Sequence, residues 1–453
     1  MRMDSDILII GGGMAGLVAG TKAAQEGASV TIVRKGEGAT SDSSGAIDVL
    51  GYLPGATIPF LSPIEGLNAV TRLMPFHPYT VLSRRNRDAA NSSDYLIERM
   101  NQSVEWLRSL LEDAEIRFVG GLQKNLALLT VLGTTKPSAL VQDTMVAGSA
   151  ADDTSVLLFA GIKGLQDFNS RVSARTYLDH QITSETGNQK VAQTDLELAP
   201  FGKPYNIAMM DAARYIETEE GLEILKETLS AEVSKIGATH VAMAPLLGIH
   251  NAREIRAALE KETGAAVFEL LSFPPSVPGY RLSRSLEMAF RKAGGTLLIG
   301  HEAISHEKNG VISSVSAKSP RRTLELTAKA IILATGKFLG GGIHGTETGL
   351  RERLFGLPVV DVDRRLLVGE KPVHLTNITA ISPKGHSLFA SGVPYDHKLR
   401  ALDSSGAIFA ENLFCAGGVL SGHNYPVEKS GLGVALLSGH VAGGIATEYA
   451  EEA

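Results

Sequence analysis

The stretch DILIIGGGMAGLVAG, residues 6–20, decides the fold. A short apolar run enters a glycine turn, the turn opens a helical stretch, and a second apolar run, ASVTIV at 28–33, follows. A strand, a glycine turn, a helix and a second strand within about 30 residues form one βαβ unit. The beginning of the chain therefore predicts a parallel α/β sheet.

The glycine turn has the spacing GxGxxG, with Gly11, Gly13 and Gly16 at the three fixed positions. In a βαβ unit these glycines allow a tight turn, a close approach of backbone to a pyrophosphate, and contact between helix and strand. The N-terminus of the helix adds free N–H groups and the positive end of its dipole. We therefore expect this turn, with Met14 and Ala15, to bind the phosphates of a dinucleotide or a flavin.

Two further glycine clusters follow apolar, strand-like runs. They are AIILATGKFLGGGIHG at 330–345 and NLFCAGGVLSGHNYPVEKSGLGVALLSGHVAGG at 412–444. Bare backbone at the end of a strand is suited to lining a ligand. From these clusters we take as candidate cofactor-binding residues Ala334, Thr335, Gly336, Gly417, Gly418, Gly431, Leu432 and Gly433.

The middle of the chain carries its own α/β pattern. Three apolar runs, at 155–162, 239–249 and 265–273, are separated by helical stretches. We predict an α/β fold: a Rossmann-like, doubly wound flavin-binding domain with an inserted α/β domain. The expected parts are the N-terminal part of the flavin domain at 1–121, the insert at 122–277, and the C-terminal part of the flavin domain at 278–453.

Composition excludes several classes of protein. With 44% hydrophobic and 20% charged residues, the 453-residue chain has ample material for a packed core. Its 43 basic and 49 acidic residues give a net charge of −6, so nucleic acid is not an expected partner. Cys415 is the only cysteine, which excludes an internal disulfide and an iron–sulfur cluster held by this chain's thiolates alone.

The sequence also lacks the patterns of metal and membrane proteins. No HExxH motif occurs, and we find no metal-ligand pattern around His301, His306, His386 or His397, so we predict no metal. No apolar run approaches the length of about 18 residues that a transmembrane helix needs. We expect a cytoplasmic protein without a transmembrane segment of its own.

Taken together, the motifs resemble a known family. The three glycine clusters are similar to those of the fumarate reductase-like branch of FAD-dependent oxidoreductases, and the whole chain resembles the B subunits of anaerobic glycerol-3-phosphate dehydrogenases. Besides the ATGKFLGGG run, the residues that carry this resemblance are SSGAIDVL at 43–50, His77-Pro78-Tyr79, GIKGLQDF at 161–168 and FPPSVPGYRL at 273–282.

The resemblance implies a flavoprotein in a quinone-linked complex that oxidises sn-glycerol 3-phosphate to dihydroxyacetone phosphate. The flavin given for this family is FMN. The implied partners are an A subunit, itself a flavoprotein, and an iron–sulfur C subunit that passes electrons to menaquinone at the inner face of the cell membrane. The resemblance also places four loop residues along the flavin ring, namely Ser43, Ser44, Gly45 and Ala46.

The sequence departs from the usual flavin pattern at three places. Arg34, followed by Lys35, stands where an acid usually binds the adenosine ribose, which leaves FAD and FMN both open. Gly418 replaces the acid that usually holds the ribitol. Relatives with covalent flavin attach it through a His ahead of the loop at 43–50, whereas the first His here is His77, so we predict a non-covalent flavin.

Oxidation of a small alcohol substrate requires a base near the carbinol proton. We take His344 and His423 as the catalytic candidates because each follows a glycine cluster; Lys337 and Lys429 accompany them as weaker candidates. Two alternatives stay open: a stand-alone fumarate reductase-like dehydrogenase, and a non-catalytic flavin relay or scaffold that accompanies a catalytic A subunit.

Overall fold

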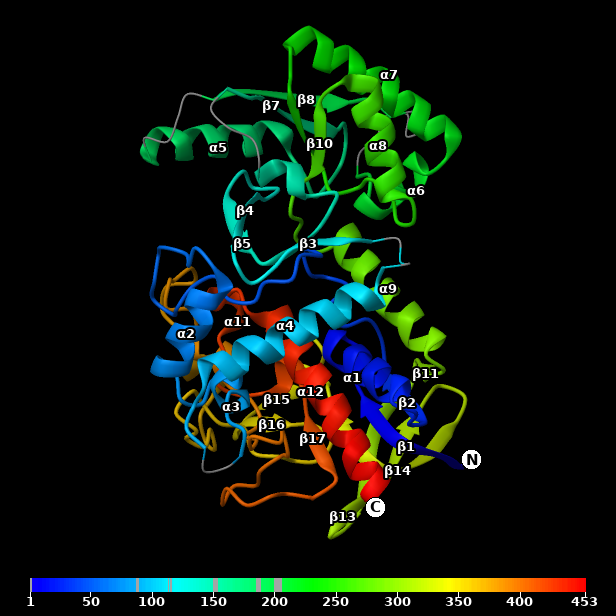
Figure 1. The fold of residues 1–453 in the computed structure, drawn as a ribbon, viewed down its shortest axis with the longest axis vertical. Helices are drawn as coiled ribbons and strands as arrows, with labels where there is room; N and C mark the ends of the chain where they lie inside the picture. The colour runs from blue at the N-terminus through cyan, green and yellow to red at the C-terminus, as the bar shows by residue number, and fades with distance from the viewer. Residues whose placement is uncertain are drawn as a thin grey trace.

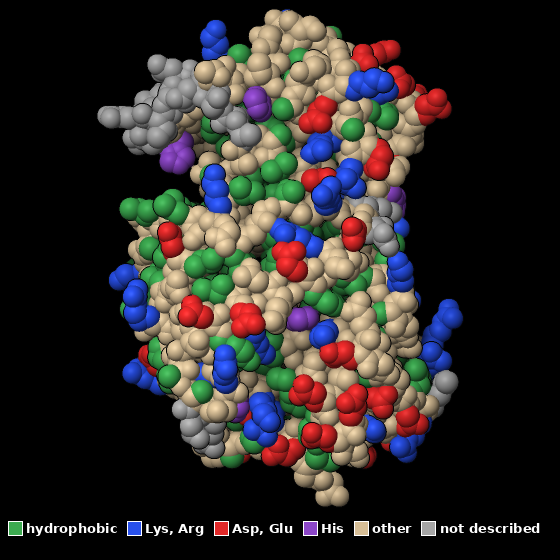
Figure 2. Space-filling view, viewed as in Figure 1, with side chains coloured by type: hydrophobic (Ala, Val, Ile, Leu, Met, Phe, Trp, Pro, Cys, Tyr) green, Lys and Arg blue, Asp and Glu red, His purple; other side chains and the backbone are tan. Residues whose placement is uncertain are grey.

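The computed structural model describes residues 2–86, 89–112, 114, 116–149, 154–184, 189–198 and 206–453. Two bodies lie one above the other in Figure 1, the lower one holding both ends of the chain and the upper one the middle of the chain (green). Figure 2 shows that the surface is hollowed between the bodies at the left, and that acidic and basic side chains are interspersed without a large basic patch on this face.

The lower body is built on one sheet, with strand order β11-β2-β1-β14-β13-β12 and β17 beside β14. The strands β11, β2, β1, β14 and β17 run parallel, and β12 and β13 form an antiparallel hairpin that turns at Gly310. This confirms the predicted βαβ unit. The bounds are β1 Arg2–Ile10, β2 Val30–Arg34, β11 Thr296–Ile299, β12 Glu302–Asn309, β13 Val311–Lys318, β14 Thr323–Leu333 and β17 Leu413–Cys415.

Helices cover this sheet, and Figure 1 shows α1, α12 and α4 together in front of it. Glycines let α1 and α12 approach closely: a Cβ on Gly439 would lie 2.5 Å from the carbonyl oxygen of Ala15, and one on Gly443 would lie 2.6 Å from that of Ala19. These two glycines of the third cluster therefore serve helix packing. The helices are α1 Met14–Gln25, α2 Pro63–Leu73, α3 Pro78–Leu82, α4 Ser93–Leu110, α9 Val277–Lys292, α10 Ser387–Ala390, α11 Tyr425–Glu428 and α12 Gly431–Glu452.

The upper body contains a parallel sheet of order β10-β9-β7-β8. The three strands expected from apolar runs are β7 Val156–Ile162, β9 His240–Met243 and β10 Ala266–Glu269. The sequence did not reveal the edge strand β8, Lys190–Leu196, because most of its side chains are exposed or half-buried and it forms no apolar run. The helices of this body are α5 Ser170–Ser184, α6 Met209–Ile216, α7 Glu219–Ile236 and α8 Ala252–Thr263.

Two small antiparallel pairs of strands lie where the bodies meet (Figure 1). β4 (Leu126–Leu129) and β5 (Thr135–Ser138) form a hairpin, and the strands on either side of it, β3 (Phe118–Gly120) and β6 (Leu140–Gln142), pair with each other. A further hairpin, β15 (Ile343–Thr346) with β16 (Gly349–Glu352), belongs to the lower body.

The apolar core is divided between the bodies. The larger cluster joins the two ends of the chain, while the second cluster is drawn from residues between Leu129 and Val277. We propose that the second cluster is the core of the inserted domain predicted at 122–277. The first part of that range is shared between the bodies, because the larger cluster also contains Leu122, Ala139 and Leu140.

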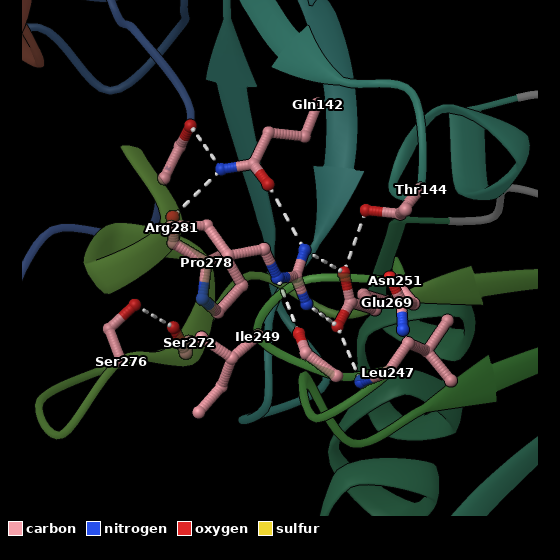
Figure 3. Close-up of polar contacts among 12 residues, drawn as sticks. Gln142, Thr144, Leu247, Ile249, Asn251, Glu269, Ser272, Ser276, Pro278 and Arg281 are labelled. Atoms are coloured by element: carbon pink, nitrogen blue, oxygen red, sulfur yellow. Dashed lines mark hydrogen bonds and ion pairs between the residues drawn. The ribbon is translucent and has the colours of Figure 1, made fainter. Parts of the chain in front are cut away.

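A buried ion pair fastens the bodies together (Figure 3). Arg281 of α9 faces Glu269 of β10 with a 2.8 Å contact, and both side chains are at most 1% exposed. Glu269 also accepts hydrogen bonds from Thr144 and from the backbone of Leu247. Gln142 accepts a hydrogen bond from Arg281, so both charges are well supplied with polar partners.

Removing one member of this pair leaves the other as an uncompensated buried charge, which typically lowers the stability of the fold by about 3–5 kcal/mol. We expect Arg281→Met to lower the free energy of unfolding by about that amount, measured by urea denaturation followed by circular dichroism. The matched control is Lys163→Met, which breaks the exposed Lys163–Glu197 pair of the upper body and is expected to change little. Equal effects of the two variants would contradict this role for Arg281.

Candidate flavin site

A cavity of about 960 Å³ opens at the carboxyl ends of β1, β2 and β14. Ligands of open parallel sheets bind at this edge. The upper body contributes Thr130, residues 134–137 and residues 271–274 to the wall of the cavity. Most of the predicted cofactor residues line it: Gly11, Gly13, Met14, Ala15, Arg34, Lys35, Ser43, Ser44, Ala46, Ala334, Thr335, Gly336, Gly418, Gly431 and Leu432.

The first glycine cluster has the geometry its spacing predicts. Gly11 has φ +115°, and a Cβ there would lie 2.2 Å from the carbonyl oxygen of Ala334. A Cβ on Gly16 would lie 1.9 Å from the carbonyl oxygen of Gly11, so Gly16 serves packing and does not line the cavity. Gly13, which precedes α1, has only the Thr40 hydroxyl within 3.4 Å and leaves its backbone open to the cavity. This division of roles is that of a phosphate-binding turn.

The other two clusters meet beside this turn. Gly418 and Gly336 line the cavity, and a Cβ on Gly418 would touch Gly336 Cα at 3.5 Å. Gly417 and Gly433 do not line it. Gly417 has φ +73° and packs against Ala15, where a Cβ would come within 2.6 Å of the Ala15 methyl group. The N–H of Gly433 donates to the carbonyl of Asp48 at 3.0 Å and so ties α12 to the loop after residue 43.

The loop at 43–46 presents one face to the cavity and the other to the junction between the bodies. Gly45 is the exception among the four predicted residues: it has φ +78°, and a Cβ there would clash with Pro278 at 2.6 Å. Its carbonyl accepts a hydrogen bond of 3.2 Å from Gln142, which also donates to the carbonyl of Pro278 at 2.8 Å. The ion-pair network of Figure 3 therefore reaches the cavity wall through Gln142 and Gly45.

Arg34 closes the cavity at the ends of β2 and β11. Its Nη2 is 2.7 Å from Glu287 and 3.4 Å from Glu37, so the cation already has carboxylate partners. Among the described residues, its buried Nε and Nη1 atoms have no hydrogen-bond partner, and the same is true of the buried Nε2 of His301 next to it on the cavity wall. The neighbouring Lys35 is mostly exposed and pairs with Glu302 at 2.9 Å.

His423, from the third glycine cluster, lies on the cavity wall and is 1% exposed. Neither of its ring nitrogens has a hydrogen-bond partner among the described residues. Burial, followed by the charges of Lys337 and His77, holds the pKa of His423 well below its ordinary value. The imidazole is therefore neutral at pH 7, the form in which one ring nitrogen is a hydrogen-bond acceptor.

Lys337 is buried beside His423, donating to the carbonyl oxygens of Phe389 and His423. Burial lowers its pKa to about 7, against the opposing effect of Glu428. Sequence reasoning missed Glu428, a fully buried carboxylate that lies 3.1 Å from His77 Nε2 and accepts from Ser430 at 2.8 Å. Burial works to raise the pKa of Glu428, but His77 and these hydrogen bonds outweigh it and hold the pKa below its ordinary value.

The structure does not bring His344 to the cavity. Its side chain is exposed on β15 and is not part of the cavity wall, so the geometry gives it no reacting atom to serve. His77 is also outside the wall: its Nδ1 accepts from the backbone of Tyr79 at 3.1 Å and its Nε2 faces Glu428.

The polar atoms of the cavity wall fit a polar ligand. Buried side-chain atoms without partners are rare in folded proteins. Among the described residues, several buried polar atoms without a hydrogen-bond partner lie on the wall of this cavity. A bound cofactor, or water ordered around it, would supply their partners. These atoms belong to Arg34, His301, Thr335 and His423.

Within the part of the chain that the structure describes, neither a metal-binding cluster nor a membrane-spanning helix is found. No group of three or more His, Cys, Asp or Glu side chains there could hold a metal ion. No helix in the same residues combines the length and apolar character needed to cross a bilayer.

The depressed pKa of Lys337 gives a pH dependence of stability with a definite sign. Between its folded value of about 7 and its ordinary value of 10.5, the unfolded chain binds one more proton, so stability rises with pH by up to about 1.4 kcal/mol per unit. Below about pH 7 this contribution is flat. Urea unfolding across that window should show the wild type gaining stability relative to Lys337→Met as the pH rises, because only the wild type carries this titrating group. Parallel curves would contradict the shift.

The family model described as "FAD binding domain" matches residues 6–434. The chain is 30% identical over 453 residues to the B subunit of a probable anaerobic glycerol-3-phosphate dehydrogenase from Halobacterium salinarum, covering 99% of each chain. It is 31% identical over 443 residues to the B subunit of the anaerobic glycerol-3-phosphate dehydrogenase from Pectobacterium atrosepticum, covering 97% of this chain and 98% of that one.

Solved structures overlap with the chain more loosely. An open conformation of a flavocytochrome c3 fumarate reductase gives a TM-score of 0.42 at 11% identity, over 99% of this chain and 79% of that chain. E. coli quinol fumarate reductase gives a TM-score of 0.42 at 11% identity, over 100% of this chain and 71% of that chain. The matches along the sequence support a flavin-binding oxidoreductase: the chain belongs to the FAD binding domain family and, within it, to the B subunits of anaerobic glycerol-3-phosphate dehydrogenases.

Proposed function

We propose that this chain is the flavoprotein subunit of a quinone-linked anaerobic glycerol-3-phosphate dehydrogenase that oxidises sn-glycerol 3-phosphate to dihydroxyacetone phosphate. The observation that carries the proposal is a cavity in which the phosphate-binding turn at Gly13 and the neutral, buried His423 share one wall. The names of the relatives supply the substrate class.

The cofactor that best fits the cavity is FAD, held without a covalent bond. The cavity continues from the turn at Gly13 to Arg34, at the end of β2, and to the neighbouring His301. In a dinucleotide-binding βαβ unit the adenosine ribose lies at the end of the second strand. An adenosine half would therefore meet these two side chains. No His precedes Ser43 in the sequence, and His77 is engaged by Glu428 and Tyr79, which favours a flavin without a covalent link.

The chemistry assigned to this chain is proton removal. The flavin, when bound, supplies the acceptor for the hydride that leaves the carbinol carbon. The hydroxyl proton of the same carbinol goes to a ring nitrogen of His423, which is neutral because of its burial and its cationic neighbours, and a ketone is left. The Lys337 amine beside His423 opposes the build-up of a second positive charge and so favours release of that proton onward.

We propose that partner subunits accept the electrons that leave this chain. The relatives are named as B subunits, which fits a complex in which an A flavoprotein subunit and an iron–sulfur C subunit carry electrons to menaquinone. We place the chain in the cytoplasm, held at the inner face of the cell membrane through these partners.

The proton-acceptor role of His423 is tested in the assembled complex. We expect His423→Gln to lower kcat/KM for glycerol 3-phosphate by about a hundredfold, which is typical of the loss of an acid–base group, with the flavin content unchanged. Steady-state oxidation with a quinone analogue and the flavin absorbance of the purified complex measure the two quantities.

His344→Gln is the matched control, since it removes the same side chain from an exposed position outside the cavity. It should leave kcat/KM within about twofold of the wild type. Full activity of His423→Gln would overturn the proposal and favour a flavin relay that accompanies a catalytic A subunit. Purification of a lone, active chain that acts on carboxylates would favour the stand-alone dehydrogenase instead.

A further inference from the structure

Two lysines enter the cavity from different bodies near its catalytic end. Lys136 lies on β5, and Lys429 follows directly after α11; both line the cavity. Their segments meet across Gly51, where a Cβ would lie 2.8 Å from the Pro137 side chain and 3.2 Å from Cβ of Lys429. The two lysines therefore line the cavity from segments that meet at the junction between the bodies.

The charges of this pair are not fully compensated. Lys136 contacts Asp48 at 2.5 Å and donates to the Ser44 hydroxyl at 3.3 Å. Lys429 donates to the carbonyl of Pro426 at 2.6 Å and has no carboxylate partner among the described residues. Burial lowers the pKa of Lys429, and the charge of Lys136 lowers it further while Asp48 opposes them. Two cations thus share one carboxylate in a half-buried place.

The backbone at Lys429 gives an independent reason to assign it a role. This residue has φ +53°, ψ +62°, the left-handed conformation in which a helix end ordinarily carries Gly or Asn. Non-glycine residues in such conformations cluster at ligand-binding positions, where the surroundings hold them in place. Here the unfavourable backbone keeps an amine on the cavity wall.

The position of the pair relative to His423 limits the size of the ligand. Five residues, Asn424 and the four of α11, separate His423 from Lys429 along the chain, and four helical residues rise about 6 Å along the helix axis. The ring of Tyr425, between them, lies 6.3 Å from that of His423. A small molecule can therefore present a carbinol to His423 and an anionic group to the lysines.

We propose that Lys136 and Lys429 form a phosphate subsite that selects small phosphate monoesters over the corresponding free alcohols. The inference rests on the proposed function for the reacting end of the substrate, and adds the residues that recognise its dianion. A dianion satisfies the excess positive charge that Asp48 leaves, through charge-assisted hydrogen bonds from the two amines.

The test compares Lys429→Gly with the wild type. Glycine keeps the left-handed backbone, so the variant should fold and retain its flavin, while Lys429→Arg keeps the charge and Lys163→Gln serves as a remote surface control. In the assembled complex we expect KM for glycerol 3-phosphate to rise about tenfold or more in the Gly variant, with kcat little changed and the Arg variant close to wild type. The preference for glycerol 3-phosphate over glycerol should fall by the same factor.

Binding of inorganic phosphate to the flavin-loaded chain, followed by the change in flavin absorbance, separates this inference from the proposed function. Phosphate binding that is lost in Lys429→Gly supports the subsite even if the wild-type complex proves unable to oxidise glycerol 3-phosphate. The subsite is wrong if Lys429→Gly retains its flavin and shows unchanged phosphate binding and an unchanged KM.

Discussion

The whole site depends on the absence of side chains where three segments of backbone converge. The turn after β1 approaches the end of β14 so closely that a methyl group on Gly11 would overlap the carbonyl of Ala334, and the strand end at Gly418 comes in beside Gly336. Because these positions are bare, the ends of three parallel strands open into one cavity instead of packing against each other. The polar side chains of the wall, such as His423 and Lys337, can then contact a ligand bound in this cavity.

The wall of that cavity is assembled from both bodies. The Arg281–Glu269 pair fixes the upper body, Gln142 carries the contact to the carbonyl of Gly45, and the loop that follows reaches α12 through Asp48 and Gly433. A neutral His, a lysine of lowered pKa and a buried carboxylate lie together at one end. Buried, closely spaced charges of this kind shift each other's pKa values and are typical of reaction sites.

Local patterns in the sequence predicted the elements and the turns well. The βαβ unit, three parallel strands of the upper body and most of the cofactor residues later found on the cavity wall follow from apolar runs and glycine spacing. Residues whose role depends on distant partners were not recoverable in this way. Glu428 is paired with His77, which is 351 positions away in the sequence and lowers the pKa of that carboxylate. His344 follows a glycine cluster but turns outward on β15, since strand alternation at a hairpin is not visible in a short, glycine-rich stretch.

The central claim is that this cavity holds a flavin dinucleotide along its whole length, from Arg34 to His423. The most direct test is to denature the purified chain in acid and to identify what is released by chromatography and mass spectrometry. We expect one FAD per chain in the supernatant and a colourless pellet. Release of FMN would contradict the placement of an adenosine half beside Arg34. A coloured pellet would contradict a non-covalent flavin. A pure chain without any flavin would contradict flavin binding in this cavity.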